Sequence, residues 1–199
     1  MFNIVRILIG FILLFVLIKI RKKIIFGHRW FICSVMAILI ISSLLLFIPF
    51  ENLFLTFDTP QKAYEYMNFK NSDIKLVVNG ENSDFIVGNN GNSDAYLILP
   101  KTTNGWKLAT GINTKRVFQG IYDGVIVYVY RYKYTNDFYI TVLDTNSSKV
   151  KIEDLFKSQF YALDNANDNG YTTYYAHIPE FNENYWIEVN GNVIKKTPD

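Results

Sequence analysis

The stretch Val125-Ile126-Val127-Tyr128-Val129-Tyr130-Arg131-Tyr132-Lys133-Tyr134 alternates two kinds of side chain along its length. Successive side chains of a β-strand point to opposite faces of the sheet. One face of this strand therefore carries four tyrosines: Tyr128, Tyr130, Tyr132 and Tyr134. The other face carries valines and then Arg131 and Lys133. Because neither face is wholly polar, we expect residues 124–134 to form a strand whose first half is central in a sheet.

The sequence on both sides of this stretch predicts further short antiparallel strands. Asn-Ser-Asp begins at positions 71, 82 and 92, and an apolar run follows each copy, as in a strand-turn meander. Asn190-Gly191 is a strong signal for a tight hairpin. The predicted strands are 74–78, 85–87, 95–99, 106–109, 115–120, 124–134, 138–144, 160–163, 171–178, 185–189 and 193–195. Together they predict a mainly-β domain over residues 51–199, built as an antiparallel sandwich or a partly closed barrel.

One short helix is expected at the start of this domain, near residues 60–67. Thr59 is suited to the N-cap position, and Pro60 is suited to the first helical turn because its missing N–H would have no helical partner. Asn68 is a plausible end.

The first 50 residues differ from the rest in charge and hydropathy. They contain no carboxylate and carry a formal charge of +6. Two apolar stretches, about 2–18 and 30–50, flank a basic loop at 19–29. This pattern predicts a two-helix transmembrane hairpin in the cell membrane, with the loop cytoplasmic and both the N-terminus and residues 51–199 outside. A cleaved signal peptide is the competing interpretation, but no small-x-small site follows the second stretch.

Charge and cysteine content narrow the function of residues 51–199. The region carries a formal charge of −4, which argues against a strongly basic nucleic-acid binder. The chain has one cysteine, so an intramolecular disulfide framework and a Cys-rich zinc site are both excluded. We expect no cofactor, no metal and no nucleic-acid partner.

The tyrosine stripe at 128, 130, 132 and 134 is the main candidate binding site. All 14 tyrosines of the chain lie after residue 50. If the stripe is exposed to solvent, its rings would stack against sugar rings or contact a partner protein. The alternative is that the rings pack across strands on a half-buried sheet face, which tyrosines commonly do.

Other chemical candidates are weaker. His177 is the one histidine after residue 50, and its residue type fits a general base, a metal ligand or a structural role. Glu153 and Asp154 are adjacent carboxylates of the kind that glycoside hydrolases bring together in space. The loop 164–170 has Asn and Gly at several calcium-loop positions, but Ala176 stands where a bidentate Glu is needed. No nucleophile elbow, zinc motif or phosphate-binding glycine loop is present.

The stretch Phe50 to Pro60, the following Tyr64-Glu65-Tyr66, Gly105-Trp106-Lys107-Leu108 and Tyr128 to Lys133 resemble small membrane-anchored proteins of low-GC Gram-positive bacteria that have no assigned activity. The resemblance implies a cell-envelope location and transfers no catalytic residue. We therefore expect a non-enzymatic, membrane-anchored binding or interaction module, with the lipid bilayer and a membrane or cell-wall component as partners. The alternatives are an envelope hydrolase using paired carboxylates, and an accessory or sensor subunit of a membrane complex.

Overall fold

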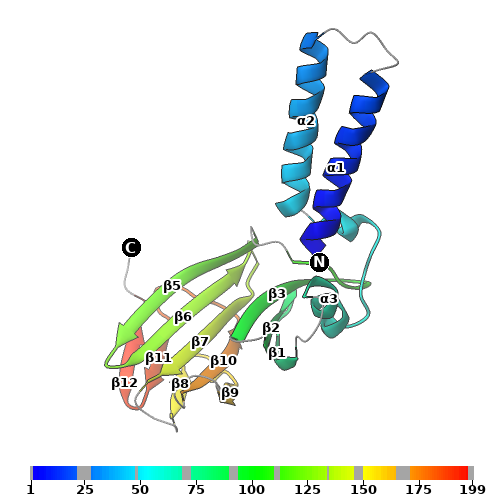
Figure 1. Cartoon of the computed structure of the whole chain (residues 1–199). Coiled ribbons are helices and arrows are strands. Elements are labelled where there is room, and N and C mark those ends of the chain that lie inside the picture. The colour runs from blue at the N-terminus through cyan, green and yellow to red at the C-terminus, as the bar shows by residue number, and fades with distance from the viewer. Residues whose placement is uncertain are drawn as a thin grey trace.

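The computed structural model shows a mainly-β protein with a pair of long helices at its N-terminal end (Figure 1). The structure describes residues 2–21, 28–47, 49–68, 73–89, 94–109, 113–133, 135–145, 150–164 and 171–196. Three sheets form the β region of these residues, and the second sheet packs with one face against the first and with the other face against the third. Face-to-face packing is that of a sandwich, but with three sheets instead of two.

Helices α1 (Phe2–Arg21) and α2 (His28–Phe47) form an antiparallel pair. Gly10 lies against Ser42 where the helices meet, since a Cβ at Gly10 would come within 2.7 Å of the Ser42 Oγ. The 3-10 helix η1 (Phe50–Leu53) and helix α3 (Pro60–Met67) follow.

Among the described residues, no helix combines the length and apolar character needed to cross a membrane. The predicted transmembrane hairpin, with spans 2–18 and 30–50, is therefore wrong. The multi-pass topology and the cell-membrane location depended on it and are wrong as well, including the cytoplasmic loop 19–29 and the outer placement of residues 51–199. Within that loop, residues 22–27 lie outside the described part of the chain.

The physical reason that neither helix meets this requirement is the short uncharged stretch within each one. Between Arg6 and Lys19, α1 has 12 uncharged residues, which span about 18 Å at roughly 1.5 Å per residue, against a hydrocarbon core of about 30 Å. Helix α2 contains Arg29 in its first turn and ends at Phe47, before the expected Phe50. Its uncharged part, from Trp30, covers about 27 Å.

The first sheet has the order β1-β2-β3-β4 and packs against α3. Its strands are β1 (Ile74–Asn79), β2 (Ser83–Asn89), β3 (Asp94–Thr102) and β4 (Gly105–Trp106). Thr59 caps α3 as expected, because its side chain accepts a hydrogen bond from the Lys62 N–H at 3.3 Å. Tyr64 of α3 is buried against Ile86 and Leu99 of the sheet.

The second sheet is the centre of the fold. Its order is β5-β6-β7-β10-β9, and its strands are β5 (Thr114–Tyr122), β6 (Val125–Tyr132), β7 (Phe138–Asp144), β9 (Tyr161–Asp164) and β10 (Thr172–Ile178). The third sheet has the order β12-β11-β8, formed by β8 (Ile152–Asp154), β11 (Trp186–Val189) and β12 (Asn192–Lys195).

Strand β6 is covered on both faces. Val125, Val127 and Val129 pack in a core shared with the third sheet, whereas the tyrosines of β6 pack in a second core shared with the first sheet. The alternating pattern of β6 therefore separates two cores, which agrees with the expectation that neither face of this strand is wholly polar.

Two-residue turns set the register of two hairpins. Asp123-Gly124 joins β5 to β6 and Asn190-Gly191 joins β11 to β12, and all four residues have positive φ. Such turns match the twist of antiparallel strands. The predicted Asn190-Gly191 hairpin is confirmed, because Val189 pairs with Asn192.

The remaining strand predictions agree with the structure to within a few residues, with two exceptions. Strand β4 is only Gly105–Trp106, whereas residues 106–109 were expected. Strand β8 was not predicted, and it pairs with β11 through residues 152–154.

Candidate functional site

The tyrosine face of the second sheet is defined here by Tyr128, Tyr130, Tyr132, Tyr139 and Tyr175. Antiparallel pairing brings these rings together, since Tyr130 lies opposite Tyr139 and Tyr128 lies opposite Thr141, which in turn lies opposite Tyr175. Phe85 of the first sheet sits over this face, with ring centroids 5.2 Å from Tyr139 and 5.9 Å from Tyr175. Aromatic contacts therefore join the first two sheets.

The four predicted binding tyrosines have different surroundings. Tyr130 and Tyr132 are 8% and 6% exposed and belong to the core between the sheets. Burial raises the pKa of both hydroxyls. Tyr128 is half-buried at the margin of that core, and Tyr134 lies outside the described residues.

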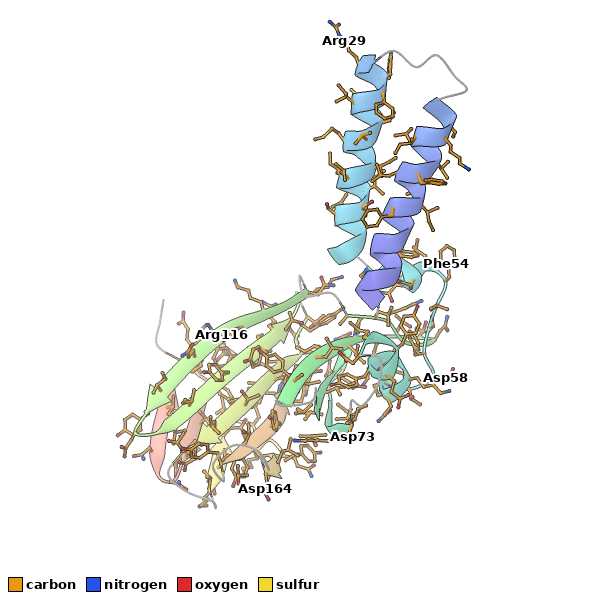
Figure 2. All side chains as sticks on the ribbon, viewed as in Figure 1. Arg29, Phe54, Asp58, Asp73, Arg116 and Asp164 are labelled. Atoms are coloured by element: carbon orange, nitrogen blue, oxygen red, sulfur yellow. The ribbon has the colours of Figure 1, made fainter. Side chains whose placement is uncertain are left out.

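Exposed residues flank the tyrosine face: Arg116 and Gln119 on β5, and Tyr96 on β3 of the first sheet. We call this surface the aromatic ledge and define it by Tyr96, Arg116, Gln119 and Tyr128. Gln119 lies opposite Tyr128, and Arg116 lies opposite Tyr130 on the same face. Figure 2 shows Arg116 on β5, the outer strand of the sheet.

Three contacts with aromatic rings hold the ledge. Tyr96 is 49% exposed, yet its ring stacks on Phe85 at a centroid distance of 5.5 Å and lies 4.8 Å from Tyr130. The Arg116 guanidinium carbon lies 5.5 Å from the centroid of the Tyr128 ring, within the range of a cation–π contact. Sequence reasoning missed Tyr96 and Arg116, because alternation within one strand does not show which residues of other strands lie beside it.

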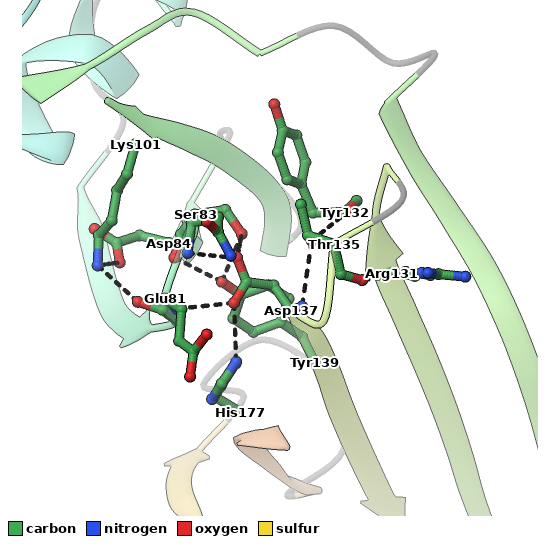
Figure 3. Close-up of polar contacts among 12 residues, drawn as sticks. Glu81, Ser83, Asp84, Lys101, Arg131, Tyr132, Thr135, Asp137, Tyr139 and His177 are labelled. Atoms are coloured by element: carbon green, nitrogen blue, oxygen red, sulfur yellow. Dashed lines mark hydrogen bonds and ion pairs between the residues drawn. The ribbon is translucent and has the colours of Figure 1, made fainter. Parts of the chain in front are cut away.

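A polar cluster lies around Asp137, which is fully buried just before β7 (Figure 3). Its carboxylate accepts hydrogen bonds from the N–H groups of Glu81 and Asn82 at 2.8 and 2.7 Å. It also accepts one from the Ser83 hydroxyl at 2.9 Å and contacts His177 Nε2 at 3.1 Å. Asp137 therefore ties the β1–β2 turn of the first sheet to β7 and β10 of the second.

Hydrogen bonding decides the ionisation of Asp137. Burial alone would raise its pKa, but the hydrogen bonds from His177, the Glu81 N–H, Ser83 and the Asn82 N–H outweigh burial and hold the pKa below its ordinary value. The carboxylate is thus held in its charged form at neutral pH.

The Asp137 cluster contains Ser, His and Asp but lacks the order of a catalytic triad. In a triad the histidine lies between the serine and the aspartate, so that it can take the serine proton. Here both Ser83 and His177 contact the carboxylate itself. Ser83 is fully buried, and its hydroxyl also lies 2.9 Å from the Tyr139 hydroxyl. This geometry gives the cluster a structural role as a tie between sheets.

The adjacent carboxylates Glu153 and Asp154 do not face each other. Asp154 is buried and accepts hydrogen bonds from Ser158 and from the Tyr185 hydroxyl. Glu153 is exposed and forms an ion pair with Lys151 at 2.9 Å. Asp154 holds the turn after β8, so the pair does not provide two carboxylates across one cleft.

Metal ligands are likewise not gathered in the described ranges, where no three His, Cys, Asp or Glu side chains come together to hold an ion. Of the calcium-like loop 164–170, residues 165–170 lie outside the described part. Asp164 itself accepts a hydrogen bond from the Thr172 hydroxyl at 2.8 Å.

Comparisons with protein-family models, with curated proteins and with solved structures found no match for this chain. The resemblance to small Gram-positive membrane-anchored proteins therefore stays a prediction, and the candidate site rests on the geometry described above.

Proposed function

We propose that this protein is a non-enzymatic binding module and that the aromatic ledge is its ligand-binding surface. The ligand class is a glycan. The observation that carries the proposal is the Tyr96 ring, which is half exposed although Phe85 and Tyr130 hold it in place.

A fixed, exposed aromatic ring suits a sugar for two reasons. The ring offers an apolar face to the C–H groups of a pyranose, and its hydroxyl can exchange hydrogen bonds with sugar hydroxyls. Because the Tyr96 ring is already ordered, binding would cost little further side-chain entropy.

The neighbouring polar side chains can orient the bound sugar through hydrogen bonds. The Gln119 amide both donates and accepts hydrogen bonds, and the Arg116 guanidinium donates several from a fixed plane. Gln119 and Arg116 are both exposed on the strand that flanks Tyr128. A few polar groups beside an aromatic surface are the usual means by which a binding site orients a ligand.

The test is calorimetric titration of the full chain with a panel of neutral and acidic oligosaccharides. We expect saturable binding of at least one sugar and a loss of at least tenfold in affinity for Tyr96→Ala. Tyr161→Ala is the matched control, because Tyr161 is also partly exposed and lies on β9 at the opposite edge of the same sheet. Absence of binding across the panel, or equal losses for the two variants, would overturn the proposal.

A further inference from the structure

Positive charge is concentrated at one end of the β5–β6 pair. Lys115 lies opposite Arg131 in the pairing, Arg116 follows Lys115, and Lys133 follows the end of β6. Residues 51–199 carry a formal charge of −4, so these four cations are opposite in sign to the net charge of their region. Among the residues that the structure describes, no carboxylate forms an ion pair with any of the four cations.

The four cations differ in what already surrounds them. The Arg131 Nε donates to the Thr135 carbonyl at 3.1 Å, and its guanidinium lies over the Phe138 ring. Lys115 and Lys133 are exposed, at positions outside the aromatic ledge. Arg116 is the cation of the ledge itself.

The contact with Tyr128 prepares Arg116 for an anion. A cation–π contact gives the N–H groups of a guanidinium no oxygen acceptor, so they stay available to a ligand. Those N–H groups match the two oxygens of a carboxylate. Since the ring limits the motion of the side chain, the geometry is partly fixed before a ligand binds.

We propose that the glycan recognised by the ledge is acidic, with a sugar ring on Tyr96 and the carboxylate of a uronic acid on Arg116. This inference rests on the proposed glycan-binding function and names the class of sugar. Tyr130 joins the two positions, because its ring lies 4.8 Å from Tyr96 and its strand position is opposite Arg116.

Other polyanions fit this surface less well. An acidic peptide would add to the outer edge of β5, which has no neighbouring strand among the described residues. The pairing of β5 shifts register between Arg116 and Phe118, and such an irregularity at a charged edge opposes strand addition. A nucleic acid would meet the net negative charge of residues 51–199.

The experiment compares a tetragalacturonate with its fully methyl-esterified form, which has the same sugar rings and no carboxylate charge. Titrated into the full chain at low salt, the acid is expected to bind at least tenfold more tightly than the ester, and the difference should shrink as salt is added. Arg116→Gln should remove the preference, so that this variant binds acid and ester with similar affinity. Lys115→Gln, one residue away at the same edge, should keep most of the preference.

The outcomes separate this inference from the function on which it rests. Equal binding of acid and ester would overturn the acidic-glycan inference and leave glycan binding in place. Failure of acid, ester and neutral oligosaccharides alike would overturn both. If polyglutamate binds as tightly as tetragalacturonate, the surface recognises polyanions in general, and the acidic-glycan inference is wrong.

Discussion

Replacing Asp137 by Asn tests the tie between the first and second sheets with little change in side-chain volume. The Asp137 carboxylate accepts four hydrogen bonds, two at each oxygen: Glu81 N–H and His177 at one, Asn82 N–H and Ser83 at the other. Asparagine keeps one carbonyl oxygen and places an NH₂ group against the other two donors. A hydrogen bond to a charged group contributes about 1.5–3 kcal/mol, so losing two predicts a loss of about 3–6 kcal/mol in the free energy of unfolding.

The assay is equilibrium unfolding in urea, followed by tryptophan fluorescence and by circular dichroism. Trp106 is a useful probe, because its indole N–H donates to Asp84 at 2.7 Å within the first sheet. Ser83→Ala removes a single donor and should cost about 1–3 kcal/mol, which covers the case in which Asp137→Asn does not fold.

Asp58→Asn is the control, since Asp58 is 81% exposed and pairs only at the surface with Lys62. Its stability should match that of the wild type. If Asp137→Asn also lies within about 1 kcal/mol of the wild type, the carboxylate does not hold the sheets together and the reasoning fails.

Three further predictions concern the same structure. Gly80→Ala should lower the free energy of unfolding by about 1–3 kcal/mol, because its Cβ would overlap the Tyr139 hydroxyl and crowd Asp137. Gly191→Ala should lower it by about 1 kcal/mol, from its positive φ alone. Urea unfolding that ranks the two variants in the reverse order would contradict this. Because the pKa of Asp137 is lowered in the folded state, its contribution to stability is present above the ordinary pKa near 3.8 and is lost as pH falls through the lower folded pKa. Unfolding measured from pH 6 to pH 2 should show this loss. Equal pH profiles for the wild type and for Asp137→Asn would refute it. Tyr130→Ala should cost about 3–5 kcal/mol as a buried aromatic ring, and clearly more than Tyr96→Ala; equal losses in thermal unfolding would show that the division between core and ledge is wrong.

Local sequence signals predicted the elements that local interactions determine. Thr59 and Pro60 fix the start of α3, and Asn190-Gly191 fixes a two-residue hairpin, so each can be recognised from a few neighbouring residues. The alternation likewise predicted which side chains share a face along β6, over residues 125–132. Strand β8 was missed because three residues are too few to show a period.

The predictions that failed depend on tertiary contacts or on helix boundaries that the sequence pattern does not contain. Hydropathy located the apolar stretches near residues 2–18 and 30–50, but it did not show that α2 ends at Phe47. The tyrosine stripe did not show which rings are buried, because the cover comes from Phe85 and Tyr96, more than 30 residues away. Likewise, His177 meets Asp137 across 40 residues of sequence.

The central claim is that ligand binds at the aromatic ledge, and nuclear magnetic resonance of the tyrosine rings tests it most directly. Tyrosines labelled with ¹³C in the full chain are followed while tetragalacturonate is added. Binding at the ledge predicts that the Tyr96 and Tyr128 signals shift with one saturable binding curve, while the signals of Tyr161 and of the buried Tyr139 and Tyr185 change little. Unchanged signals at Tyr96 and Tyr128, with binding detected elsewhere or not at all, would contradict it.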